Sequence, residues 1–296
     1  GPPIACLEYI TTFEGNTFFM TELGKDNKYI DIEKTIRESD SELLTRIPPY
    51  AIKWIQSIVK QDEINHILNK YSDYSGKEFL DKIIKEFNVT IEVEGKENLP
   101  ENDKCFFVAN HPYGILDGLI LTYIVSEKYG RLKAIANDAF MLIPQLHPFI
   151  AAVNVYGRSS KAYIKALDDT FAMDIPITHF PSGEVSRVYN KKIQDTVWQK
   201  SFIKKAISSD RAIVPIYISG RNSALFYTIF LFRRLFHIEV NLELMLLPRE
   251  IFKKRNKTVK VIIGEQIPHQ LFVETKSHQD WAQEVRSRVY NLRNIN

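Results

Sequence analysis

The sequence predicts an α/β fold, in which a mixed and mainly parallel sheet is flanked by helices and preceded by an α-helical N-terminal segment. Three observations lead to this prediction. The 296 residues suffice for two domains of about 150 residues, or for one α/β domain with an addition. Hydrophobic residues at 45% and charged residues at 25% are typical of globular proteins. After residue 88, short β-rich runs alternate with helical stretches, which favours parallel strands joined by helices.

Residues 1–87 are expected to form the N-terminal segment, in which the spacing of apolar residues predicts amphipathic helices. Pro48 and Pro49 break the chain, and Pro49 suits the first turn of the helix that follows. The predicted elements are a strand near 18–20, a helix from Ile32, a helix with one apolar face over 50–69, and an amphipathic helix after Gly76.

Residues 88–296 are expected to form the α/β domain. Its alternating pattern places helices on both faces of the sheet. The predicted strands lie at 89–93, 105–109, 132–136, 152–156, 176–180, 212–218 and 258–263. The predicted helices lie at 116–129, after Asp138, at 160–172, at 197–208, over the apolar run from Ala224, and from Gln279.

Charge, cysteine count and targeting signals exclude several classes of protein. The 39 basic and 36 acidic side chains give a net charge of +3, which is too small to indicate nucleic acid as the main partner. The two cysteines, Cys6 and Cys105, are too few for a disulfide-stapled domain or a zinc ribbon. No residues have metal-ligand spacing and no glycine-rich phosphate loop occurs, so we expect no metal and no bound cofactor. The start of the chain lacks the pattern of a signal peptide, so we expect a cytoplasmic protein.

Two apolar regions are candidates for contact with a lipid bilayer. Nothing reaches the run of about 18 apolar residues that a spanning helix needs. The stretch 224–232 is wholly apolar and is followed by Arg233, Arg234 and His237, which gives an apolar helix whose basic end can lie in a headgroup layer. The alternative is a buried core helix with a solvated tip. With the N-terminal helices and Trp54, this stretch predicts a peripheral protein on the inner face of the cytoplasmic membrane.

The most informative segment joins an apolar strand to a polar turn and a helix. It reads Phe106-Phe107-Val108-Ala109-Asn110-His111-Pro112-Tyr113-Gly114-Ile115-Leu116-Asp117-Gly118. Such junctions are where α/β sheets place ligands, and a histidine there can transfer protons near neutral pH. After the turn, the Asp117 carboxylate can accept the Nδ1 proton of His111, which leaves Nε2 as a general base. We therefore expect His111 and Asp117 to form a catalytic dyad; the alternative is a structural pair in which Asp117 caps the helix.

This segment resembles the first block, Asn-His-x4-Asp, of the PlsC-type glycerolipid acyltransferases, with five residues here between His111 and Asp117. Its residue pattern, Asn-His-Pro-aromatic-Gly-x-Leu-Asp-Gly, is similar to that of the branch of hemolysin-like, ornithine-lipid and glycine-lipid O-acyltransferases. Three further blocks follow in the expected order, and the resemblance covers about residues 90–225. They are Val155-Tyr156-Gly157-Arg158, Phe180-Pro181-Ser182-Gly183-Glu184-Val185-Ser186-Arg187 and Val214-Pro215-Ile216.

The resemblance implies transfer of a fatty acyl group from acyl carrier protein (acyl-ACP) or acyl-CoA to the hydroxyl of a lyso-lipid. In the third block Ser182, Glu184 and Val185 occupy the positions of the family's Glu, Thr and Arg, and the nearest guanidinium belongs to Arg187. Because phosphate recognition by a guanidinium is geometrically demanding, we do not expect lysophosphatidic acid to be the acceptor. The resemblance to this branch implies instead an acylated amino acid, a lyso-lipid of the ornithine- or glycine-lipid type. The predicted substrate-binding residues are Asn110, Gly114, Arg158, Ser182, Gly183, Glu184, Arg187 and Arg221.

Individual roles follow from residue type. Arg158 and Arg187 are expected to hold the acceptor carboxylate, with a solvated helix start and a surface ion pair as their alternatives. Gly114 is expected to let a backbone N–H approach an oxyanion, and His179 is expected to be a satisfied core residue. The basic clusters at Lys191-Lys192, Arg233-Arg234 and 253–255 are candidates for docking an acidic carrier protein, or are simply solvated.

Three other functions remain open at this point. The chain could be a 1-acylglycerol-3-phosphate acyltransferase with a shifted headgroup site. It could be a thioester hydrolase, in which water replaces the lipid hydroxyl. It could also be a non-catalytic protein that binds lipid or acyl carrier, with a structural His–Asp pair.

Overall fold

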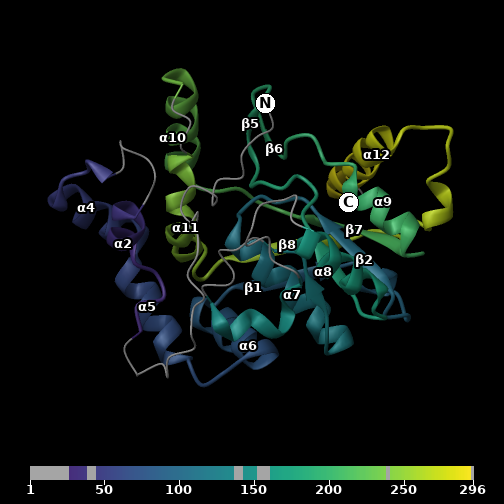
Figure 1. The fold of residues 1–296 in the computed structure, drawn as a ribbon, viewed down its shortest axis with the longest axis horizontal. Coiled ribbons are helices and arrows are strands. Elements are labelled where there is room, and N and C mark those ends of the chain that lie inside the picture. Colours follow the sequence, from purple (N-terminus) through teal and green to yellow (C-terminus); the bar gives the residue numbers. More distant parts are fainter. Residues whose placement is uncertain (1–26, 39–44, 137–142, 152–160, 238–240, 295–296) are drawn as a thin grey trace.

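The computed structural model describes residues 27–38, 45–136, 143–151, 161–237 and 241–294. Within these ranges a six-stranded sheet forms the centre of the molecule (Figure 1). Its strands are, in spatial order, β1 (Thr90–Glu94), β8 (Thr258–Ile263), β7 (Ala212–Ile218), β2 (Cys105–Ala109), β4 (Ile177–His179) and β3 (Lys133–Ala134). Neighbouring strands are parallel except for the pair β7–β8, so the prediction of a mixed, mainly parallel sheet is confirmed.

Strand β2 is buried on both faces because helices cover both sides of the sheet. Its residues Phe107 and Ala109 belong to one apolar cluster, and Phe106 and Val108 belong to another. The first cluster includes residues of α6 (Gly76–Phe87) and α7 (Ile115–Tyr129). The second includes residues of α8 (Lys161–Ala172), α9 (Ser201–Ser208) and α12 (His278–Asn291). A strand buried on both faces reads as a continuous apolar run, which is why the sequence predicts its bounds correctly.

The prediction of a single helix over 50–69 is wrong. The chain forms α4 (Pro49–Val59) and α5 (Gln61–Lys70), which are separated by Lys60 in a left-handed conformation with φ 66°. The break allows three amide side chains on one face of α5 to bind the backbone of residues 27–32. Gln61, Asn65 and Asn69 accept hydrogen bonds from the amides of Ile32, Ile30 and Asn27 at 2.8, 2.9 and 2.9 Å.

Other elements differ from expectation in smaller ways. The helix α2 (Ile32–Arg37) begins as predicted, whereas the hairpin of β5 (Arg187–Tyr189) and β6 (Lys192–Gln194) was not expected. The 3-10 helix η4 (Leu242–Leu246) and the helix α11 (Leu247–Lys253) were not expected either. Further 3-10 helices within the described ranges are η1 (Lys96–Asn98), η3 (Pro144–Phe149), η5 (His269–Leu271) and η6 (Leu292–Asn294). The strand near 18–20, the helix after Asp138 and the strand at 152–156 lie outside the described residues. The domain boundary at residue 88 stays a prediction.

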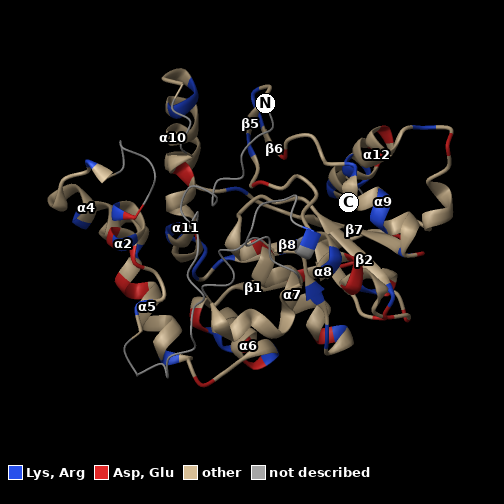
Figure 2. Ribbon diagram, in the orientation of Figure 1, with Lys and Arg blue, Asp and Glu red and all other residues tan. Residues whose placement is uncertain are grey.

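The apolar run forms α10 (Ala224–Leu235), which is half buried rather than fully buried. Phe226, Tyr227 and Phe230 face the protein, whereas Leu231, Phe232, Leu235 and Phe236 are exposed. Figure 1 shows α10 rising away from the sheet, and Figure 2 shows its basic residues at the outer end. None of the helices in the described part of the chain combines the length and hydropathy that crossing a bilayer requires.

Candidate active site

The candidate site begins where β2 ends. Asn110 and His111 follow the strand directly, and a turn over 112–114 leads into α7, which carries Asp117 in its first turn. This is the carboxyl edge of the parallel strands, where α/β sheets bind ligands. The sequence prediction therefore places the histidine and the aspartate correctly relative to the sheet.

His111 and Asp117 are in contact. The Nδ1 atom of His111 lies 3.0 Å from Oδ2 of Asp117, the hydrogen-bond distance that the dyad requires. The same oxygen accepts the backbone N–H groups of Tyr113 at 2.7 Å and Gly114 at 2.8 Å. The His111 side chain is 16% exposed, whereas that of Asp117 is fully buried. With Nδ1 bound to the carboxylate, Nε2 is left as the ring nitrogen that can accept a proton.

Burial raises the pKa of Asp117, and the hydrogen bonds from His111 and the two amides oppose that rise. The second carboxylate oxygen, Oδ1, is buried without a hydrogen-bond partner among the described residues. Asp117 thus caps the start of α7 and orients His111 at once, so the two interpretations given by the sequence are compatible.

Gly114 makes the turn possible. Its φ is 92°, a backbone conformation that residues other than glycine rarely adopt. A Cβ at this position would lie 2.9 Å from Cδ2 of Leu247. Its own N–H already donates to Asp117. That amide is therefore committed to the dyad in this structure, and an oxyanion would need a different donor.

Asn110 joins two strands. Its Nδ2 donates to the carbonyl of Ile218 at 2.9 Å, and its Oδ1 accepts the N–H of the same residue at 2.7 Å. The side chain is buried, and this pair of bonds links the end of β2 to the end of β7. The predicted role of Asn110 in substrate binding stays a prediction, and the structure gives the residue a clear part in shaping the site.

The third block lies against the dyad. The ring of Phe180 stacks on His111 with 4.1 Å between ring centroids and 21° between planes. Ser182 donates to the carbonyl of Glu184 at 2.7 Å, and Gly183 has φ 71°, so both residues form the turn. The Tyr189 hydroxyl donates to Oε1 of Glu184 at 3.2 Å, and burial together with this carboxylate raises the pKa of Tyr189 to about 12.

Arg187 is completely buried, so the alternative of a surface ion pair is wrong. Its Nε donates to Oε1 of Glu243 at 2.9 Å, and Nε of Arg233 donates to Oε2 of the same carboxylate at 3.1 Å. The rings of Phe226 and Phe230 lie 5.6 Å from the Arg187 guanidinium. Its Nη1 donates to the carbonyl of Val185, whereas Nη2 is buried without a hydrogen-bond partner among the described residues. Two guanidinium groups thus share the carboxylate of Glu243.

The two remaining predicted arginines do not join this cluster. Arg221 is exposed, and its carbonyl accepts a hydrogen bond from Nζ of Lys254 at 2.8 Å. Arg158, with the whole second block, lies outside the described residues.

Sequence reasoning missed several residues near the site. Glu243 and Asp195 are buried carboxylates in segments without a recognisable pattern, and each binds a residue of the first or third block. The Tyr113 hydroxyl donates to the carbonyl of Ser219 at 2.9 Å. The position of Tyr113 in the Asn-His-Pro-aromatic-Gly pattern was the one signal that could have drawn attention to it.

His179 is not the satisfied core residue that the sequence suggested. It ends β4 beside Val108 of β2, stacks on Phe106, and has a buried Nδ1 without a hydrogen-bond partner among the described residues. Burial, with a smaller effect of the neighbouring His111, lowers the pKa of His179 from 6.5 to about 4.

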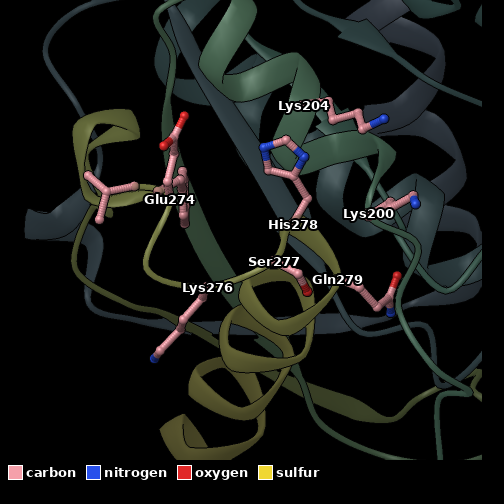
Figure 3. Close-up of a pocket in the computed structure, with 9 residues that line it drawn as sticks. Lys200, Lys204, Glu274, Lys276, Ser277, His278 and Gln279 are labelled. Carbon is pink, nitrogen blue, oxygen red and sulfur yellow. The ribbon is translucent and has the colours of Figure 1, made fainter.

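Two surface cavities lie away from the dyad. One of about 500 Å³ lies between α9 and the start of α12 and is shown in Figure 3. Its lining includes three lysines, Lys200, Lys204 and Lys276, together with the acidic Glu274. The other, of about 440 Å³, is lined by Asp62, Glu63, His66, Ile67, Glu86, Phe252 and Arg255. Neither contains a predicted site residue, and the described ranges contain no cluster of three or more metal-ligating side chains.

We predict that His179 makes the free energy of unfolding fall in acid, because its pKa is lowered in the native protein. Between pH 6.5 and 4 the unfolded chain binds a proton at this residue that the native protein does not bind, so the free energy of unfolding falls as the pH falls. The contribution amounts to about 3 kcal/mol over this interval. We expect His179→Phe, which keeps a stacked ring, to have a flatter dependence of unfolding free energy on pH in urea titrations. His278→Phe, an exposed control, should behave like the wild type; equal slopes for the wild type and His179→Phe would contradict the prediction.

Comparison with known proteins identifies the family. The lyso-glycine lipid O-acyltransferase of Phocaeicola vulgatus is 37% identical over 264 residues, which cover 89% of this chain and 95% of that protein. The lyso-glycine lipid O-acyltransferase of Bacteroides thetaiotaomicron is 36% identical over 264 residues, covering 89% and 97%. The crystal structure of the 1-acyl-sn-glycerophosphate acyltransferase PlsC from Thermotoga maritima has a TM-score of 0.45 and 18% identity, covering 82% of this chain and 92% of that chain. The acyltransferase family model matches residues 34–296, and this chain therefore belongs to the acyltransferase family.

Proposed function

We propose that this acyltransferase moves a fatty acyl group from an acyl thioester to the hydroxyl of a lyso-aminolipid of the glycine-lipid or ornithine-lipid type. The observation that carries the proposal is the 3.0 Å contact between His111 and the buried Asp117 at the carboxyl edge of the sheet. The names of the two relatives, which are 37% and 36% identical over most of their length, support the acceptor class.

The proposed chemistry uses His111 as the base. Its Nε2 takes the hydroxyl proton while the hydroxyl oxygen attacks the thioester carbonyl, and Asp117 stabilises the imidazolium that forms. The tetrahedral intermediate then collapses, the carbon–sulfur bond breaks, and the imidazolium returns the proton to the departing thiolate. A thiol leaves without strong acid assistance, so one base suffices and no metal or bound cofactor takes part.

The arginine cluster supports a carboxylate on the acceptor. Arg187 and Arg233 both donate to the carboxylate of Glu243, and a planar guanidinium pairs well with the planar carboxylate of an amino acid. The buried Nη2 of Arg187 still lacks a partner among the described residues, and buried donors are normally satisfied. Arg158 stays the second proposed carboxylate ligand, and Ser182, Gly183, Glu184 and Arg221 are proposed to line the acceptor path.

The donor is proposed to be acyl-ACP or acyl-CoA. Of the three basic clusters, the pair Lys191 and Lys192 on the β5–β6 hairpin is the one whose residues are all exposed, which supports this pair as the docking surface for an acidic carrier. In the other clusters Arg233 binds Glu243, and Lys254 donates to the Arg221 carbonyl.

We propose that the lipid bilayer contacts the helices α4 and α10. Trp54 and Tyr50 on α4 are 67% and 77% exposed, and Phe232 and Phe236 are exposed beside Arg233 and Arg234 at the end of α10. Exposed aromatic residues next to basic ones suit the boundary between headgroups and acyl chains of an anionic bilayer. We accordingly propose peripheral attachment to the inner face of the cytoplasmic membrane.

The base is tested by thiol release from acyl-ACP and acyl-CoA, with lyso-glycine lipid, lyso-ornithine lipid or lysophosphatidic acid as acceptor. We expect acceptor-dependent release for the wild type with a lyso-aminolipid, and a loss of about 10²- to 10⁴-fold or more in kcat for His111→Ala. His278→Ala, which removes an exposed histidine far along the chain, is the matched control and should keep full activity.

The alternatives give different results in the same assay. Release of free fatty acid without an acceptor would indicate a hydrolase, and preference for lysophosphatidic acid would indicate the glycerophosphate activity. Equal rates for His111→Ala and the wild type would remove His111 as the base and favour a binding protein.

Membrane attachment is tested by co-sedimentation with vesicles of phosphatidylglycerol and phosphatidylethanolamine. The double variant Phe232→Ser/Phe236→Ser should bind about tenfold or more weakly, because two large apolar side chains no longer enter the bilayer. The control Leu271→Ser/Val273→Ser alters exposed apolar residues elsewhere and should bind like the wild type. Unchanged binding of the α10 variant would show that this helix does not contact the membrane.

A further inference from the structure

Asp195 is a buried carboxylate in the loop between β6 and α9, and it is 2% exposed. Its Oδ1 accepts the backbone N–H of His111 at 3.1 Å and the hydroxyl of Ser186 at 2.5 Å. Its Oδ2 accepts the indole N–H of Trp198 at 2.9 Å. One carboxylate thus joins the histidine of the first block, the serine of the third block and a fully buried tryptophan.

The backbone of Asp195 is itself held by α12. Its N–H donates to the hydroxyl of Tyr290 at 2.8 Å, and its carbonyl accepts Nη2 of Arg286 at 2.8 Å. The carbonyl of Trp198 accepts the side-chain amides of Gln279 and Gln283 at 2.9 and 2.8 Å. The position of the carboxylate is therefore set by a helix that packs on the sheet, rather than by the loop alone.

Both backbone polar groups of His111, the N–H and the carbonyl, are hydrogen-bonded. Asp195 binds the N–H, and the backbone N–H of Ser186 donates to the carbonyl at 2.7 Å. Since the Ser186 hydroxyl also donates to Asp195, both contacts depend on the same carboxylate. Asp117 and Phe180 fix the ring, so Asp195 supplies the missing restraint on the backbone from which the ring extends.

We infer that Asp195 is a positioning residue for the base, acting through the backbone of His111 and through Ser186 without touching substrate. This inference rests on the proposed role of His111 in the reaction. A shift of about 1 Å in a reacting group can cost about 10²-fold in rate, so a fixed backbone at the base has a direct effect on kcat.

The surroundings of Asp195 require a carboxylate. The backbone N–H of His111 and the indole N–H of Trp198 can only donate, and they approach different oxygens of Asp195. An asparagine has the same shape but carries one NH₂ group, which in either orientation faces one of these donors. Asp195→Asn therefore places two donors against each other and leaves a buried N–H without a partner.

This conflict suggests a rescue experiment. Trp198→Phe removes the indole N–H, so in the double variant Asp195→Asn/Trp198→Phe the amide NH₂ can turn towards residue 198. The amide oxygen then accepts the His111 N–H and the Ser186 hydroxyl, as the carboxylate did. Trp281→Phe is the matched control, because Trp281 is also buried but donates its indole N–H to the carbonyl of Val273.

The variants are compared by thiol release with the active donor and acceptor, below the unfolding temperature of each. We expect Asp195→Asn to lower kcat by about 10- to 100-fold, with KM for donor and acceptor changed by less than about threefold. Asp195→Asn/Trp198→Phe should recover at least about tenfold in kcat relative to Asp195→Asn, whereas Asp195→Asn/Trp281→Phe should recover nothing. If Asp195→Asn does not fold, Ser186→Ala should lower kcat at constant KM.

The outcomes separate the two proposals. Full activity of His111→Ala would overturn the proposed function, whatever Asp195 does. If His111→Ala is inactive, three results would overturn the positioning role alone: wild-type kcat in Asp195→Asn, an equal response to Trp198→Phe and Trp281→Phe, or a rise in KM at unchanged kcat. If Asp195→Asn is unfolded, a wild-type kcat in Ser186→Ala would overturn the positioning role.

Discussion

The buried carboxylate of Asp117 is the interaction on which the site depends. Removing a carboxylate from water costs several kcal/mol, and here three donors converge on one oxygen to offset that cost. Two of the donors are amides of the turn that precedes α7, and the third is the ring of His111. The same carboxylate therefore caps the start of a helix and orients the histidine, so both features rely on one side chain.

The central strands of the six-stranded sheet are predictable because both faces of the sheet are covered. β2, β7 and β8 occupy 105–109, 212–218 and 258–263, the bounds that the apolar runs predict. The contact between His111 and Asp117 is also accessible to sequence reasoning, because a short turn with proline and glycine separates a strand end from a helix start. Local patterns of this kind need no knowledge of distant parts of the chain.

The remainder of the site depends on contacts between distant segments. Asp195 lies 84 positions from His111, and Glu243 lies 56 positions from Arg187, so no local periodicity indicates that either pair meets. The same reason explains why Arg187 could be taken for a surface residue, since only the packing of α10 and η4 around it makes it buried. The break at Lys60 escaped prediction because the polar face of α5 binds residues 27–32, which the spacing of apolar residues does not reveal.

The five-residue spacing between His111 and Asp117 is compatible with the dyad because the turn contains Gly114. A longer turn must still bring the amides of Tyr113 and Gly114 to the same oxygen that His111 reaches. With φ at 92°, Gly114 redirects the chain so that the first turn of α7 brings the Asp117 carboxylate to Nδ1 of His111. Leu247 and Val185 pack where a Cβ would stand, at 2.9 and 3.1 Å, so α11 and the third block close around the turn only with glycine there. The turn thus accommodates five residues between His111 and Asp117 while their side chains stay in contact.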